Sequence, residues 1–312
     1  MVKNNLMKLP EELQFITNGR MSQKSTSARL DGKICVISGT TSGIGRETAK
    51  LLAGGGAKLV MVCRNKEKAV EFQKEITQTY GTQAEVIIAN FERLTEVNQA
   101  AEEISTRFPK INLLINNAGI HNTGRRLTAD GNEMVFQVIH LASFLLTKKL
   151  TDNLTRGAPA RVIDINSEAH RFGGLNLRDL NWSKRPYIAL RAYGAAKIAQ
   201  LLSALEFAKR LASSGVTVNV VHPGEVRTNI GMNNHIFYRM YNRYLLRWFL
   251  KDPVHAGHTI YYLAAAPELQ NITGKFFNQT IEEKPASYIM KEDLKRGIWE
   301  LSEQLLKPYL EK

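Results

Sequence analysis

Short apolar runs alternate along the chain with longer segments in which apolar positions recur every three or four residues. Runs rich in Val, Ile and Leu are typical of buried parallel strands, and the longer periodic segments are typical of amphipathic helices. We expect strands near residues 33–38, 58–63, 84–89, 112–116, 160–166, 216–221 and 274–277. We expect helices over residues 44–54, 66–79, 94–108, 128–155, 190–213, 253–266 and 289–306.

The regular alternation of strands and helices predicts an α/β fold, namely a Rossmann-type doubly wound parallel sheet of about seven strands with helices on both faces. No internal repeat or low-complexity linker interrupts the pattern, so residues 30–312 are interpreted as one domain and residues 1–29 as an N-terminal extension. Ligands of such sheets bind at the carboxyl ends of the strands. The functional residues are therefore expected along that edge.

Composition narrows the choice of partners. The 42 Lys and Arg residues outnumber the 29 Asp and Glu residues, which gives a net charge of +13 and allows contact with an anionic surface. No nucleic-acid recognition motif accompanies this charge, so no nucleic-acid partner is predicted. No stretch reaches the roughly 20 apolar residues of a membrane span, and no signal-peptide pattern is found. Cys35 and Cys63 fall on predicted strands as small apolar residues, which favours a reduced, cytoplasmic compartment.

A glycine-rich turn at residues 38–45 joins the first predicted strand to the first predicted helix. Glycine lets the backbone approach a pyrophosphate closely, and the N-terminus of the following helix offers free N–H groups and the positive end of the helix dipole. The sequence therefore predicts a dinucleotide-binding turn. Its candidate contact residues are Gly39, Thr41, Ser42, Gly43, Ile44 and Gly45.

Tyr193 and Lys197 are four residues apart in a predicted helix, which places the phenol and the ammonium group on one face. The ammonium would stabilise the phenolate and lower a tyrosine pKa that is ordinarily about 10. A surface tyrosine beside a solvated lysine has the same spacing. The glycine-rich turn upstream, together with Ser167 at the end of a predicted strand, favours the interpretation as a catalytic acid/base.

Several motifs follow one another in the order and spacing of the short-chain dehydrogenase/reductase family, which the chain resembles over residues 30–277. They are the glycine-rich turn, Asn116-Asn117-Ala118-Gly119, Ser167, Tyr193 with Lys197, and Pro223-Gly224. Segments 144–147, 167–170 and 221–224 are most similar to the retinol-dehydrogenase-like and related lipid-reductase branch. By this resemblance, further residues join the cofactor site: Asn117, Ala118, Gly119, Pro223, Gly224 and Thr228.

The resemblance also implies a role for each of three side chains. Tyr193 would give a proton to a carbonyl oxygen in reduction, or remove one from an alcohol in oxidation. Lys197 would hold the nicotinamide ribose, besides stabilising the phenolate, and Ser167 would orient the substrate oxygen. The nicotinamide would carry the hydride, and no metal site is predicted.

Charge at the end of the second predicted strand favours NADP(H) as the cofactor. A carboxylate at this position would bind the free 2′-hydroxyl of NAD, but the chain has Arg64, which can bind a 2′-phosphate with help from Lys66 or Arg46. A solvated basic turn is the alternative. After the third strand the family usually has an Asp near the adenine, whereas this chain has Asn90, whose amide can still hydrogen-bond an adenine edge.

One position departs from the family pattern. The family has an Asn in the helix after the Asn-Asn-Ala-Gly turn, where it helps to hold a water linked to the catalytic Lys, and the alignment places Ile139 there. Isoleucine cannot hydrogen-bond, and His140 points about 100° away around the helix. The proton path from Lys197 to solvent would therefore lose a member. This leaves an alternative to the active enzyme, namely an NADP(H)-binding pseudoenzyme or scaffold.

Residues 225–250 are expected to form a substrate lid, because the segment after Pro223-Gly224 closes over substrate in the family. The segment is rich in aromatic and aliphatic residues, with Arg239, Arg243 and Arg247 on one stripe. An apolar body suits a lipophilic substrate such as a retinoid, steroid or fatty aldehyde, and a basic stripe suits peripheral contact with an anionic membrane. A helix packed on its own core or on a dimer face is the alternative. By analogy with the family, a homodimer or homotetramer is expected.

Overall fold

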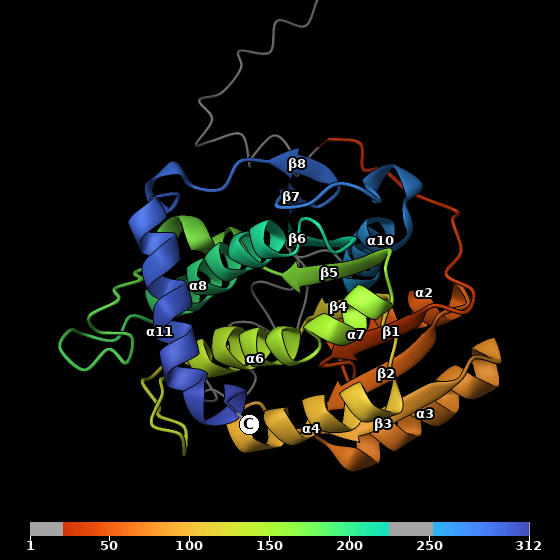
Figure 1. The fold of residues 1–312 in the computed structure, drawn as a ribbon, viewed down its shortest axis with the longest axis horizontal. Helices are drawn as coiled ribbons and strands as arrows, with labels where there is room; N and C mark the ends of the chain where they lie inside the picture. Colours follow the sequence, from red (N-terminus) through yellow and green to blue (C-terminus); the bar gives the residue numbers. More distant parts are fainter. Residues whose placement is uncertain (1–20, 225–251, 312) are drawn as a thin grey trace, which may run out of the picture.

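The computed structural model describes residues 21–224 and 252–311, and confirms the predicted α/β fold. Its eight strands form one sheet in the order β3-β2-β1-β4-β5-β6-β7-β8 (Figure 1). All neighbouring pairs are parallel except β7 and β8, which are antiparallel. The strands are β1 (Ile34–Ser38), β2 (Lys58–Cys63), β3 (Ala84–Ile88), β4 (Leu113–Asn116), β5 (Ala160–Ile165), β6 (Val216–His222), β7 (Phe276–Asn278) and β8 (Ile281–Glu283).

Helices cover both faces of this sheet, because the strands are apolar on both sides. On β1, Val36 packs in one core with α4, α6, α8 and α11, whereas its neighbour Ile37 packs in a second core with α2, α3 and α10. Figure 1 shows α4, α6 and α8 together on the first face, with α11 running across them. The long helices are α2 (Gly43–Gly54), α3 (Lys66–Tyr80), α4 (Leu94–Arg107), α6 (Ala142–Lys149), α8 (Ala189–Arg210), α10 (Pro253–Ala265) and α11 (Glu292–Leu310).

Two sequence predictions need correction. The strand β8 was not predicted, because three residues are too few to show a period-two pattern. The predicted helix over residues 128–155 is wrong at its start and is interrupted. Residues 128–133 form a turn, and the Glu133 carboxylate caps α5 (Met134–Phe136) by accepting from the backbone N–H groups of Val135 and Phe136. A π-helical turn, η2 (Gln137–Leu141), then precedes α6, and α7 (Thr151–Arg156) is separate.

Part of the predicted N-terminal extension lies against the turn between β7 and β8. The Lys24 N–H donates to Thr280 Oγ1 at 2.8 Å, and Gln23 Oε1 accepts from the Thr280 N–H at 2.9 Å. The remainder of the extension, residues 1–20, and the predicted lid with its three arginines lie outside the described residues. In the part of the chain that the structure describes, no helix is both long enough and apolar enough to cross a membrane.

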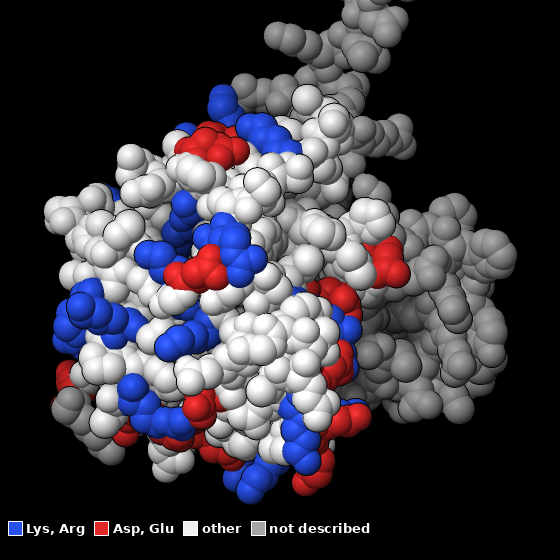
Figure 2. Space-filling view, turned by 90° about the vertical axis from the view of Figure 1, so that its right-hand side faces the viewer, with Lys and Arg blue, Asp and Glu red and all other residues white. Residues whose placement is uncertain are grey.

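Figure 2 shows how basic and acidic side chains are distributed over one face of the molecule. Basic and acidic side chains are interspersed there among uncharged surface. Elsewhere in the described residues, exposed charges are paired, as in the ion pair between Arg107 and Glu85 at 2.8 Å. Among the coloured residues of that view, no continuous basic field is seen, so the charge excess alone does not mark this face as a membrane contact.

Candidate active site

The predicted site residues follow six parallel strands close to the point where each strand ends. The glycine-rich turn follows β1, Arg64 follows β2, Asn90 follows β3, Asn117 follows β4, Ser167 follows β5 and Pro223 follows β6. Because parallel strands end at one edge of the sheet, the fold brings these residues together. Tyr193 and Lys197 reach the same edge from α8. Thr228, the remaining candidate, lies outside the described residues.

The turn after β1 is held by Asn117 and closed against the start of α2. The Asn117 side-chain amide donates to Ser38 O at 2.8 Å and to Gly39 O at 3.0 Å. Ser38 Oγ accepts from the backbone N–H groups of Asn117 and Ala118, both at 3.0 Å. A Cβ at Gly45 would lie 2.2 Å from Gly39 O, so only glycine fits there. Asn117 therefore shapes the glycine-rich turn through its side-chain amide.

The N-terminus of α2 is suited to an anion. Ser42 is the N-cap residue, and its side chain makes no capping hydrogen bond to the helix. No acidic residue lies in the first turn of α2, so the helix itself carries no carboxylate there that would neutralise the positive end of its dipole. Thr41 and Ser42 directly precede Gly43, which adopts a positive φ of 57°. The turn therefore fits a dinucleotide pyrophosphate.

Arg64 has a carboxylate partner that the sequence did not reveal. Its Nη1 donates to Glu92 Oε1 at 2.9 Å, and the Arg64 side chain is 55% exposed. Arg46, which was predicted to help, pairs with Glu75 and lies 4.2 Å from the centre of the Phe72 ring. A 2′-phosphate at Arg64 would therefore compete with Glu92.

Asn90, the predicted adenine contact, is engaged in the turn that it begins. Its Oδ1 accepts from the Glu92 N–H at 3.1 Å, and its own N–H donates to Glu96 Oε2 at 2.9 Å. These two bonds fix the turn between β3 and α4. Asn90 lies two residues after the end of β3, and its bond to Glu92 places it beside the Arg64–Glu92 pair. Its contact with the adenine stays a prediction.

Lys197 is buried under Tyr193 and bound to the protein. Its Nζ lies 5.8 Å from the centre of the Tyr193 ring and donates to Ile165 O at 2.6 Å and Gln200 Oε1 at 3.1 Å. Burial lowers the pKa of Lys197 to about 7, and the nearby Asp164 carboxylate opposes that shift. The Tyr193 ring is half-buried and packs edge-on against His121, with ring centres 5.6 Å apart. Lys197 is thus placed to influence the phenol electrostatically.

Ser167 begins the short helix η3 (Glu168–Phe172), and its Oγ accepts from the Ala169 N–H at 3.2 Å. The backbone of η3 packs directly on α8 beside the tyrosine, because a Cβ at Gly194 would lie only 2.4 Å from Ala169 O. This close approach sets the serine segment against the helix that carries Tyr193. Arg171 anchors η3 further by pairing with two carboxylates, Glu168 at 2.5 Å and Glu283 of β8.

Ile139 lies in the π-helical turn η2 and is fully buried in the core that α6 and α8 share. His140, the neighbouring residue considered as a substitute, is also buried, and its Nε2 lies 2.7 Å from Ser302 Oγ of α11. Burial lowers the pKa of His140 to about 3, so the imidazole is neutral near pH 7. Position 139 therefore carries no polar side chain, and the neighbouring His140 imidazole is engaged with Ser302.

Comparison with known proteins assigns the chain to a class. The short chain dehydrogenase family model matches residues 33–237, so the chain belongs to this family of oxidoreductases. Among named relatives, it is 34% identical to retinol dehydrogenase 14 of Mus musculus, over 93% of this chain and 90% of the relative. It is 35% identical to retinol dehydrogenase 13 of Homo sapiens, over 94% and 89% of the two chains.

Solved structures agree on the fold. An uncharacterized protein from Mycobacterium paratuberculosis superposes with a TM-score of 0.74 at 28% identity, covering 92% of this chain and 98% of that one. A short chain dehydrogenase from Burkholderia cenocepacia J2315 in complex with NADP has a TM-score of 0.63 at 24% identity, with coverage of 80% and 97%. The predicted resemblance to the family, including its retinol-dehydrogenase-like branch, is therefore confirmed.

Proposed function

We propose that the chain is an NADP(H)-dependent oxidoreductase that interconverts a hydrophobic alcohol and its aldehyde or ketone. One observation carries the proposal: Lys197 is buried 5.8 Å from the centre of the Tyr193 ring, at the sheet edge where Ser167 also lies. A buried ammonium beside a phenol is an arrangement that activates a tyrosine as an acid/base near neutral pH. The named relatives, two of which are retinol dehydrogenases, support the same reaction type.

In the proposed reduction, a bound nicotinamide supplies the hydride. Ser167 orients the carbonyl oxygen by hydrogen-bonding, and Tyr193 gives its phenolic proton to that oxygen as the hydride arrives. The positive charge of Lys197 stabilises the phenolate that remains. In oxidation the same groups act in reverse, and Tyr193 removes the alcohol proton. The turn that Asn117 and Gly45 shape would hold the pyrophosphate on the N-terminus of α2.

The hydrophobic substrate is supported by apolar side chains that flank the proposed catalytic residues. Phe172 at the end of η3 is 55% exposed, and Ile188 and Leu190 at the start of α8 are 48% and 53% exposed. Tyr288, which donates to His170 O of η3 at 2.8 Å, is 46% exposed. Exposed apolar groups on the segments that carry a polar site favour a lipophilic ligand. A retinoid, steroid or fatty aldehyde fits this chemistry. We expect a screen of such carbonyls and alcohols, followed by nicotinamide absorbance, to reveal turnover.

We expect NADPH to bind at least about tenfold more tightly than NADH, a difference of about 1.4 kcal/mol. Arg64 is the group that would meet the 2′-phosphate, and Arg64→Asp should remove or invert the preference. Because Glu92 holds Arg64 at 2.9 Å, Glu92→Gln should tighten NADPH binding and leave NADH binding unchanged. Fluorescence titration of the three proteins with both nucleotides measures this. Equal affinities of the unmodified protein for NADPH and NADH would contradict the NADP(H) assignment.

A second candidate function is an NADP(H)-binding pseudoenzyme or scaffold, and Ile139 is the observation that favours it. The buried Ile139 side chain offers no hydrogen bond, so it cannot help to hold a relay water beside Lys197. In the pseudoenzyme, the nucleotide would bind and the chemistry would be absent.

Replacing Ile139 with Asn is expected to lower the free energy of unfolding by about 1–3 kcal/mol, since a buried amide without a partner costs that much. Ile139→Val, which keeps the site apolar, should cost only about 0.5–1.5 kcal/mol. Urea unfolding and turnover of both variants are the measurements. Our proposed enzyme predicts that turnover of the folded Ile139→Asn protein does not rise. Turnover that appears only after this substitution would establish the second candidate instead.

A further inference from the structure

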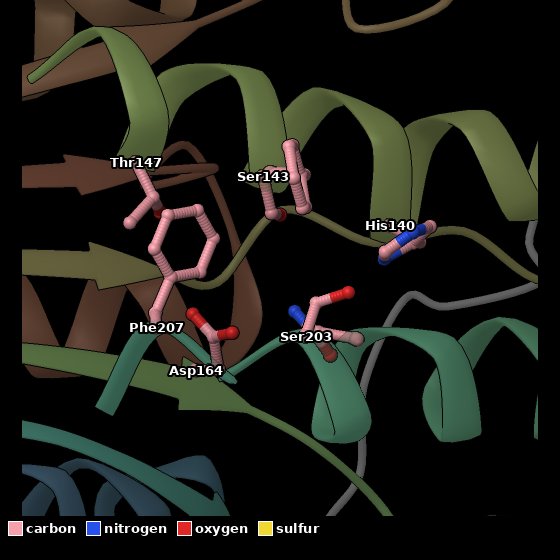
Figure 3. Close-up of a pocket in the computed structure, with 8 residues that line it drawn as sticks. His140, Ser143, Thr147, Asp164, Ser203 and Phe207 are labelled. Atoms are coloured by element: carbon pink, nitrogen blue, oxygen red, sulfur yellow. The ribbon is translucent and has the colours of Figure 1, made fainter. Parts of the chain in front are cut away.

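A small polar cavity lies beside Lys197, where α6, α8 and β5 meet. Its volume is about 10 Å³, which is close to the minimum that one water molecule requires. Figure 3 shows side chains converging on it from α6 and the preceding π-helical turn on one side and from α8 on the other, with Asp164 rising from β5 between them. The lining residues are His140, Ser143, Phe144, Thr147, Asp164, Gln200, Ser203 and Phe207.

Three polar atoms of this lining are buried without a hydrogen-bond partner: Ser143 Oγ, Ser203 Oγ and Gln200 Nε2. Their residues are only 2%, 3% and 2% exposed. Buried polar groups in proteins are nearly always satisfied, and where the protein supplies no partner a buried water usually does. A cavity with several unpaired donors and acceptors and room for one water molecule is therefore a water-binding site.

Asp164 lines the cavity together with Gln200, which is a hydrogen-bond partner of Lys197. Asp164 Oδ1 accepts from Asn116 Nδ2 at 2.7 Å, and Gln200, which lines the cavity, accepts from Lys197 Nζ at 3.1 Å. The two charges act on each other through space: burial raises the pKa of Asp164 to about 6, and the positive charge of Lys197 opposes the rise. A carboxylate within an apolar strand costs desolvation free energy, so we expect another interaction or a function to compensate for that cost.

We propose that Asp164, solvated by a water molecule in this cavity, is the buried counter-ion that keeps Lys197 protonated when the dinucleotide binds. The role of this counter-ion in catalysis rests on the function proposed above. Asp164 is a positioning residue, because it acts on the reaction only through Lys197. A neutral Lys197 could not stabilise the phenolate of Tyr193. With Ile139 at the position of the family's Asn, the buried Asp164 and its water add to the support that Ile165 O and Gln200 give the lysine.

The proposal is tested by Asp164→Asn, which removes the charge and keeps the oxygen that accepts from Asn116. Without its counter-ion, Lys197 should lose its proton at a pH at least about one unit lower, a tenfold change in proton affinity. Two readouts follow this shift: the pH dependence of the free energy of unfolding, which needs no activity, and the pH dependence of NADPH affinity. Asp152→Asn, on the exposed surface of α7, is the matched control and should change neither.

Asp164 and Lys197 should make the free energy of unfolding depend on pH in opposite directions. Folded Asp164 keeps its proton to about pH 6 and the unfolded chain loses it near 3.8, so this group makes the free energy of unfolding fall between these values. Folded Lys197 loses its proton at about pH 7 and the unfolded chain near 10.5, so the free energy of unfolding rises above pH 7. In Asp164→Asn the fall should disappear and the rise should begin at lower pH.

Other titrating groups around the lysine are present in both the unmodified protein and Asp164→Asn. Their contributions cancel when the pH profile of one protein is subtracted from that of the other. They are His140 from η2, His170 and Arg171 from η3, Tyr193 from α8, and His222 from β6. Identical pH profiles for Asp164→Asn and the unmodified protein would overturn the proposal. Failure of the unmodified protein to bind NADPH would defeat the proposed function alone, because the unfolding readout still reports on Lys197.

Ser203→Val provides a second test should Asp164→Asn not fold. The valine fills the cavity with apolar atoms, so the displaced water can no longer solvate the carboxylate and the pKa of Asp164 should rise further. The fall of the unfolding free energy should then extend to higher pH. A Ser203→Val protein that is more stable with an unchanged pH profile would show that the cavity is a packing defect, and would overturn the proposal.

Discussion

Replacing Tyr193 with Phe is expected to lower turnover at least about 10³-fold, within the range that a positioned acid/base contributes. The substitution removes only the transferable proton. The ring that packs 5.6 Å from His121 and 5.8 Å from Lys197 Nζ remains, so NADPH affinity should change less than about twofold. Steady-state turnover and fluorescence titration of the same preparation measure both quantities.

A matched control is Tyr80→Phe, at the end of α3, where the side chain is 37% exposed and far along the chain from the site. It should leave turnover and affinity unchanged. Turnover retained by Tyr193→Phe would mean that another group supplies the proton, and the roles given to Tyr193 and Lys197 would have to be withdrawn.

Replacing Gly45 with Ala should weaken dinucleotide binding by up to about 100-fold. The added Cβ would lie 2.2 Å from Gly39 O and 2.4 Å from Asn117 Nδ2, so the phosphate-binding turn and its Asn117 clamp must both shift. Forcing a methyl group into a closely packed site costs about 1–3 kcal/mol, and the upper end of that range corresponds to about 100-fold in affinity. Titration with NADPH measures the loss.

Gly54→Ala, in the last turn of the same helix, is the control for general effects on α2. A Cβ there would lie 3.4 Å from the Tyr80 ring, which is ordinary contact, and alanine favours a helix over glycine by about 0.5–1 kcal/mol. This variant should bind NADPH normally and be at least as stable as the unmodified protein. If Gly45→Ala also bound normally, the turn after β1 would not be the pyrophosphate site.

The sequence predicted the sheet well because its strands are buried on both faces, and continuous apolar runs such as residues 34–37 and 59–63 leave little ambiguity. It also predicted which residues meet at the carboxyl edge, since that follows from parallel topology. The sequence did not predict β8, which is short and lies at an edge of the sheet. It also placed the start of a helix at residue 128, whereas α5 begins at Met134. There Glu133 ends a turn by capping the helix, an interaction between groups that hydrophobic periodicity does not report.

Contacts between side chains from distant segments could not be predicted from the sequence. The Glu92 partner of Arg64 comes from the turn after β3, and it changes the expected strength of the 2′-phosphate contact. The hydrogen bonds that Lys197 Nζ donates to Ile165 O and Gln200 Oε1 depend on how α8 packs on β5. One signal was available: Asp164 is a charge within an apolar strand, and such a residue is usually paired or functional.

The most direct measurement of the central claim uses NADPH deuterated at the transferable position of the nicotinamide, with a set of retinoid, steroid and fatty carbonyls as acceptors. Our account predicts that the unmodified protein produces an alcohol with one deuterium on the former carbonyl carbon, and that Tyr193→Phe produces almost none. Mass spectrometry of the extracted product detects the transfer independently of any change in absorbance. Tight NADPH binding without deuterium in any product would contradict the account and leave a nucleotide-binding scaffold.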